Sequence, residues 1–150
     1  MKVSLFLLTL ILTINTYSQS EKSLEETKAY ILKITNQYGE LKDGSKINVE
    51  FYGDLLSVKS GMGKLFGSPI YYETLYDFKN VYRFKGPLRK SGNIGEIVIW
   101  VDATTNSKSY RWKKNVFKIN MIDYQASEQL MIALQHLNKL LKNKTNIEKF

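Results

Sequence analysis

Cysteine is absent from this chain of 150 residues. No disulfide can therefore hold the fold together, no thiol can act as a nucleophile, and no lipid can be attached through a cysteine. Such a chain depends on its hydrophobic core alone, and a domain of this length can bury a sufficient core. For an exported protein, the absence of cysteine is more typical of a bacterial envelope than of a eukaryotic exterior.

Histidine occurs once, at His136. A single histidine without cysteine cannot provide the usual zinc ligands, and the sequence motifs of serine hydrolases, zinc proteases and phosphate-binding loops are missing. Two carboxylates could in principle hydrolyse a glycoside, but the candidates Glu73, Asp77, Glu96 and Asp102 are scattered as on an ordinary solvated surface. The sequence therefore predicts a protein that is not an enzyme, with no catalytic residue, metal or cofactor.

The one long apolar run lies within the first twenty residues. Lys2 precedes a largely apolar segment (3–14), and Thr16 and Ser18 give a small-x-small cleavage signal, with Ser18 and Ser20 as a second choice. This is the layout of a secretory signal peptide, and the run is shorter than the ~20 residues of a membrane-spanning helix. We therefore expect export to the periplasm or beyond, with cleavage after Ser18 or Ser20 and no transmembrane segment afterwards.

Removal of residues 1–18 would leave 132 residues, the size of one domain. We expect a single globular domain over residues 19–144 and a frayed tail over 145–150. The formal net charge is +8 for the whole chain and +7 without Lys2. An excess of positive charge of this size bears on the solubility of the protein and on the partners that it attracts, but it does not indicate a fold.

Two amphipathic helices are predicted, one at each end of the domain. Ser23 and Glu26 form a capping box before an apolar stripe that extends over residues 24–38, and Gly39 stands where a left-handed helix cap would fall. Asp123 is a candidate N-cap for the second helix. The apolar face of that helix consists of Leu130, Ala133, Leu134, Leu137 and Leu141. His136 falls beside this face, on the boundary between core and solvent.

Between the helices, alternation of apolar and polar residues predicts about seven short strands. They fall near residues 46–52, 55–59, 70–75, 81–85, 94–101, 110–113 and 117–121. Residues 60–69 and 86–93 are predicted to be loops, and 77–80 a turn. The strand at 94–101 is apolar on both faces, which predicts a central position covered on both sides. Because no helix separates the strands, they must pair in an antiparallel manner.

The positive charge predicts the candidate binding site. Cations alternate with apolar side chains on the predicted strands or lie on an adjacent loop, and they are Arg83, Lys85, Arg89, Lys90, Arg111, Lys113 and Lys118. Gathered on one face, they would attract anionic lipid head groups, lipopolysaccharide, acidic glycans or an envelope protein. Nucleic acid is a weaker candidate, because an exported protein seldom meets it. The alternative interpretation is that the charge only keeps the domain soluble and monomeric.

Three stretches carry a resemblance to known proteins. The segment ending in "TYSQS", the early helix "SLEETKAYILKI" and the closing "FKINMIDYQASEQLMIALQHLNKLL" resemble small exported proteins of Bacteroidetes-type bacteria. In those proteins the last helix carries an A-L-x-H-L-like run, here residues 133–137. The resemblance implies an envelope protein without an assigned activity, and it implies that His136 is a packing position.

The order of elements also resembles a pleckstrin-homology-like barrel, in which a C-terminal helix closes one end of about seven strands. The additional N-terminal helix departs from that fold, and no phosphoinositide-binding signature is evident. We thus expect an α+β protein with an N-terminal helix, an antiparallel meander forming a barrel or strongly curved sheet, and a C-terminal helix packed on it. A helix-grip fold is the alternative. A binding module is the first functional hypothesis, a carrier of a small apolar ligand or lipid the second, and a hydrolase the third.

Overall fold

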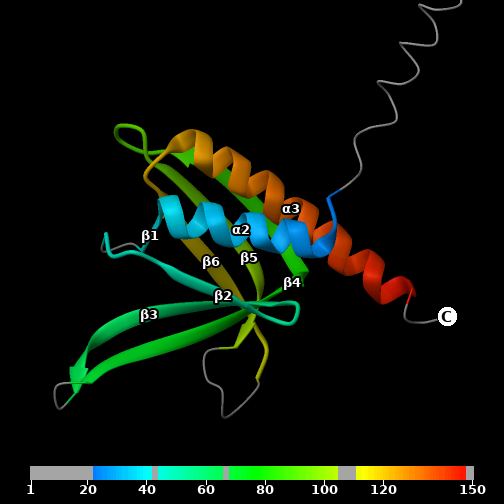
Figure 1. Cartoon of the computed structure of the whole chain (residues 1–150), viewed down its shortest axis with the longest axis horizontal. Helices are drawn as coiled ribbons and strands as arrows, with labels where there is room; N and C mark the ends of the chain where they lie inside the picture. The colour runs from blue at the N-terminus through cyan, green and yellow to red at the C-terminus, as the bar shows by residue number, and fades with distance from the viewer. Residues whose placement is uncertain (1–21, 42–43, 66–67, 105–110, 148–150) are drawn as a thin grey trace, which may run out of the picture.

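The computed structural model describes residues 22–41, 44–65, 68–104 and 111–147. The predicted signal segment therefore lies outside the described residues. The chain forms an α+β fold, as predicted (Figure 1). In sequence order its elements are α2 (Leu24–Tyr38), β1 (Gly39–Glu40), β2 (Asn48–Tyr52), β3 (Leu55–Leu65), β4 (Ser68–Arg89), β5 (Gly95–Thr104), β6 (Lys113–Met121) and α3 (Tyr124–Ile147).

The strands within the described residues belong to one antiparallel sheet with the order β1-β6-β5-β4-β3-β2. The sheet curls into a half-barrel, and α2 and α3 lie side by side across its hollow (Figure 1). Curling brings the two ends of the sheet together, because Glu40 in β1 forms an isolated bridge with Lys46, just before β2. The strongly curved meander predicted from the sequence is confirmed.

The described sheet has six strands, not the seven predicted: β4 covers two predicted strands, β6 runs through the break predicted before residue 117, and β1 was not predicted. In β4 the strand is continuous where a turn was expected at residues 77–80. Local turn chemistry is present: the carboxylate of Asp77 accepts hydrogen bonds from the backbone N–H of Lys79 (3.0 Å) and the side chain of Asn80 (2.8 Å). Pairing with β5 nevertheless continues on both sides of this segment, across a register shift. The segment is therefore a bulge, and it directs Phe78 into the core, where that side chain is fully buried.

Residues 60–65 and 68–69, which lie in a segment predicted as a flexible loop, belong to two long strands. The backbones of β3 and β4 pair as far as Leu65 and Ser68, with a register shift between Gly61 and Lys64. The resulting hairpin extends away from both helices (Figure 1). Glycine disfavours strands only weakly, and pairing with a partner strand outweighs that preference here. Similarly, β4 continues to Arg89, into the segment predicted as the next loop.

The first helix has the predicted bounds and the predicted capping box. The hydroxyl of Ser23 accepts from the backbone N–H of Glu26 (3.2 Å), and the Glu26 carboxylate accepts from the N–H of Ser23 (2.7 Å). The prediction for Gly39 is wrong, because its backbone is extended (φ −81°). Glycine is required there for another reason: an added Cβ would lie within 3 Å of the Thr35 carbonyl oxygen and the Ile47 side chain.

The second helix, α3, begins as predicted after Asp123, whose carboxylate accepts from the N–H of Gln125 (2.9 Å). It continues through Ile147, so residues 145–147, predicted to lie in the tail, are helical. Its apolar face covers the inner face of the sheet. The largest fully buried side chains of this contact are Leu130, Leu134, Leu137, Ile97, Ile99, Ile119 and Phe78. Fully buried side chains of both helix and sheet thus form this contact.

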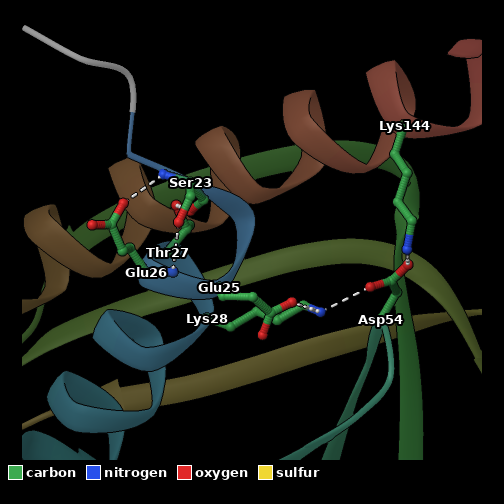
Figure 2. Close-up of polar contacts among 7 residues, drawn as sticks. All are labelled: Ser23, Glu25, Glu26, Thr27, Lys28, Asp54 and Lys144. Atoms are coloured by element: carbon green, nitrogen blue, oxygen red, sulfur yellow. Dashed lines mark hydrogen bonds and ion pairs between the residues drawn. The ribbon is translucent and has the colours of Figure 1, made fainter.

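A cluster of ions ties α2, the β2–β3 turn and α3 together (Figure 2). Asp54, in the turn, accepts from the ammonium groups of Lys28 in α2 and Lys144 in α3, both at 2.8 Å. Lys28 also pairs with Glu25 (2.9 Å), and its side chain is 7 % exposed. These contacts fix the ends of both helices against the sheet.

One edge of the sheet is only partly covered, because β1 pairs with just the last two residues of β6. Among the described residues, no other strand lies beside that edge. The side-chain oxygen of Asn115 accepts a hydrogen bond from the N–H of Val116 (2.7 Å). One backbone donor of this strand is thus satisfied by its own neighbour.

Candidate functional site

The candidate site lies on the outer face, which we define as the face of β4, β5 and β6 turned away from α3. In β5 its side chains alternate with the buried Ile97, Ile99 and Val101, because successive residues of a strand point to opposite faces. The outer positions of β5 are Glu96, Val98, Trp100 and Asp102. The prediction that this strand is central is confirmed. Cover on both sides is not found, because Val98 and Trp100 are only half-buried.

The register of the sheet places cations in neighbouring rows across the outer face. Lys85 and Lys118 flank Val98, and in the next row Arg83 lies beside Trp100. Arg83, Lys85 and Lys118 are exposed. Neighbouring strands are spaced about 4.8 Å apart. Because β5 lies between Lys85 and Lys118, the backbones of these two lysines are roughly 10 Å apart.

Aromatic rings hold some of these cations in place. The Arg83 guanidinium lies 5.3 Å from the centre of the Trp100 ring, and the Lys114 ammonium lies 4.9 Å from that of Tyr82. Attraction to the electron-rich face of a ring restrains the cation without neutralising it. Such a guanidinium keeps hydrogen-bond donors available for a phosphate, sulfate or carboxylate group.

Glu96 is the nearly buried acid of the outer face, and its side chain is 8 % exposed. It forms ion pairs with Lys118 and, at 3.2 Å, with Lys90. Burial disfavours its charged form, but the hydrogen bonds from the two lysines outweigh burial and hold the pKa of the carboxyl below its usual value. One carboxylate thus fixes two cations and neutralises only part of their charge.

Of the seven predicted site residues, Arg83, Lys85, Lys90 and Lys118 share this region and three do not. Arg89 pairs with Gly95, next to α3, and its guanidinium lies 4.1 Å from the centre of the Tyr124 ring. Lys113 pairs with the buried Ala103, so it lies on the opposite face from Lys118. Arg111 is exposed just before β6.

The sequence interpretation missed Trp100, Tyr82 and Lys114 as parts of this face. Trp100 was assigned to a strand covered on both sides, and Lys114 to a break between two strands. The sequence did contain a signal for Lys114. Residues an even number of positions apart in one uninterrupted strand point to the same face, so Lys114 and Lys118 must share a face.

Each of the four candidate carboxylates has a hydrogen-bond or ion-pair partner. Glu73 accepts from the hydroxyl of Ser57 (2.7 Å), whereas Glu96 is paired with lysines. Asp77 and Asp102 are cross-strand partners. Asp77 is engaged by its own bulge, and Asp102 accepts from the hydroxyl of Tyr82 (2.6 Å). Both carboxylates thus already accept hydrogen bonds within the sheet.

A second concave feature, which we call the helix groove, lies between α2 and α3, with a volume of about 330 Å³. It is lined by Lys22, Thr27, Tyr30, Gln129, Ile132, Ala133 and His136. His136 is half-buried at the boundary, as predicted, and its Nε2 lies 3.1 Å from the carbonyl oxygen of Lys22. None of the residues that line the groove is a carboxylate that could form a catalytic pair with this ring.

Metal-binding clusters and membrane-spanning helices are both absent from the described part of the chain. It contains no group of three or more histidine, aspartate or glutamate side chains placed to hold a metal ion. None of its helices combines the length and the apolar character needed to cross a membrane.

Comparison of the chain with protein-family models, with curated proteins and with solved structures finds no match.

Proposed function

We propose that this protein is a non-enzymatic, exported binding protein whose outer face contacts a polyanionic surface of a bacterial envelope. The observation that carries the proposal is the arrangement of Arg83, Lys85 and Lys118 in adjacent rows beside Trp100, on a face that no described helix covers. The layout of the first twenty residues supports export.

The spacing of the cations is compatible with a polyanion. The backbones of Lys85 and Lys118 lie roughly 10 Å apart, so their ammonium groups can lie apart from each other. Repeated anionic groups, as on lipid head groups or acidic glycans, can pair with each cation separately. Each exposed pair contributes only about 0–1 kcal/mol, so several are needed and binding must weaken with salt.

Other functions have less support. A carrier with an internal pocket would need space between α3 and the sheet, and fully buried leucines fill this contact. A hydrolase would need two carboxylates available to one substrate, whereas those of the sheet have partners. A partner protein remains compatible with the same cations, provided that it presents acidic side chains.

The experiment compares two charge-matched double variants. Arg83→Gln/Lys85→Gln removes two outer-face cations, and Lys33→Gln/Lys142→Gln removes two exposed helix cations. Binding to vesicles of phosphatidylcholine with phosphatidylglycerol, and to soluble dextran sulfate, is measured at 50 and 200 mM salt. We expect the outer-face variant to bind at least several-fold more weakly than the control variant. Equal losses in both variants would show that only net charge matters and would overturn the proposal.

A further inference from the structure

The helix groove contains a large apolar side chain that is exposed to water. Ile132, on α3, is 66 % exposed, although it lies next to Ala133 and faces Tyr30 of α2 across the groove. The two helices run side by side (Figure 1). A volume of about 330 Å³ is at the lower end of the range of small-molecule pockets.

The polar groups of the helix groove gather at its rim and favour an anion. The Lys22 ammonium lies 4.7 Å from the centre of the Tyr30 ring, and the Tyr30 hydroxyl donates to the side-chain oxygen of Gln129 (3.1 Å). Because a carbonyl oxygen only accepts, Nε2 of His136 carries the hydrogen in its contact with Lys22. None of the residues lining the groove is acidic.

We propose that the helix groove binds one small amphiphile with an apolar body and a single anionic head group. The body would cover Ile132, Ala133 and the ring of Tyr30, which removes apolar surface from water. The head group would lie at Lys22, the cation of the rim. A free monomeric amphiphile fits better than a membrane surface, because the groove has room for one chain and lies between two helices.

This site is independent of the outer face. Its lining residues come from α2, α3 and Lys22, which lies two positions before α2, and none belongs to β4, β5 or β6. The charge complementarity that selects its occupant comes from Lys22, which takes no part in the outer face.

Three probes of equal chain length test the proposal: decanoate, decanol and decyltrimethylammonium, each below its micelle concentration. Binding to the protein recovered from the envelope of an expression host is measured by titration calorimetry. We expect decanoate to bind at least five-fold more tightly than decanol, and the cation most weakly. Lys22→Gln should reduce decanoate binding to the level of decanol without changing decanol binding.

A matched pair of isoleucine variants tests the apolar wall. Ile132→Gln should weaken decanoate binding at least five-fold, whereas Ile122→Gln, which alters a 47 % exposed isoleucine outside the groove, should not. Both positions are exposed, so both variants should fold. Equal binding of the three probes, or unchanged decanoate binding by Ile132→Gln, would overturn the proposal. Arg83→Gln/Lys85→Gln should leave decanoate binding unchanged, which separates this test from that of the outer face.

Discussion

Asp54 is the residue through which the two helices and the sheet are held to one another. It accepts from Lys144 and Lys28, and hydrogen bonds from these two lysines hold the pKa of its carboxyl below the usual value of 3.8, although partial burial opposes them. A carboxyl whose pKa is lowered by folding stabilises the folded state above its unfolded pKa. That stabilisation is lost as the pH falls through the folded pKa.

Replacing Asp54 by asparagine keeps its shape and removes its charge. We expect Asp54→Asn to lower the free energy of unfolding at pH 7 by about 1–3 kcal/mol, because the nearly buried Lys28 keeps its pair with Glu25 but loses the Asp54 carboxylate, and Lys144 loses the same carboxylate. The difference from the parent protein should shrink as the pH is lowered below 3.8, where the parent's Asp54 also becomes protonated. Urea denaturation followed by tryptophan fluorescence measures both effects.

The control for this variant is Glu50→Gln, which removes the carboxylate of a more exposed pair with Lys59. Exposed pairs contribute little to stability, so a smaller loss is expected. A loss as large as that of Asp54→Asn would show that the cluster at Asp54 adds nothing beyond an exposed ion pair.

His136 and Leu134 lie two positions apart on α3 in different surroundings. His136→Gln should change the free energy of unfolding by less than about 1 kcal/mol, because the imidazole is half-buried at the rim of a groove. Leu134→Ala should cost about 2–5 kcal/mol, because a fully buried side chain leaves a cavity. Thermal denaturation of both variants gives the comparison. Similar losses would mean that the contact between His136 and the Lys22 carbonyl is a major anchor of the N-terminal segment.

At the scale of elements, the helices could be predicted from the sequence and the strand boundaries could not. Ser23, Glu26 and Asp123 act on backbone groups within a few residues, so their roles are visible in the local sequence. Strand boundaries depend on which chain lies alongside. The polar residues at 77–80 form a turn-like bulge, yet β5 on one side keeps β4 continuous.

The same dependence explains the partial success for the candidate site. Alternation identified Lys85 and Lys118 as outward-facing, but only the register of three strands shows that they flank Val98. Because a break was predicted before residue 117, the alternation could not be followed from Lys113 to Lys118, and it did not show that these side chains point to opposite faces of the sheet. Arg89 could not be placed, because its position beside Tyr124 depends on where α3 crosses the sheet.

The capping box of α2 offers a test at this scale. Ser23→Ala removes the acceptor for the N–H of Glu26, and we expect a loss of about 0.5–2 kcal/mol in the free energy of unfolding. Asn36→Ala, on the exposed side of the same helix, should be neutral or slightly stabilising, because alanine has the higher helix propensity. Chemical denaturation measures the free energy of unfolding of both variants. Equal changes in the two variants would show that the cap contributes nothing to stability.

At the scale of the whole molecule, α2 and α3 pack against each other, and both lie against a sheet formed by the segments between them (Figure 1). Strand β1, which follows α2 directly, pairs with β6, the last strand of the sheet. Folding therefore joins segments about eighty residues apart, and such non-local pairing makes folding slower than in a helical bundle.

Export is the prediction that concerns the whole chain. Intact-mass measurement of envelope material should find a protein that begins at Gln19 or Glu21, because cleavage is predicted after Ser18 or Ser20. Recovery of the full-length chain from the cytoplasm would contradict this prediction and would remove the basis for an envelope partner.

The partly covered edge of β6 bears on how the molecule avoids aggregation. An exposed strand edge is a template on which a second copy can add its own strand and start a growing assembly. Here the N–H of Val116 already donates to the side chain of Asn115 and is less available to a second copy. Pairing of two copies along this strand would also bring their lysines at positions 113, 114 and 118 close together, and these like charges repel. The cations of this strand thus act against self-association, so high salt, which screens their repulsion, should favour oligomers over monomers.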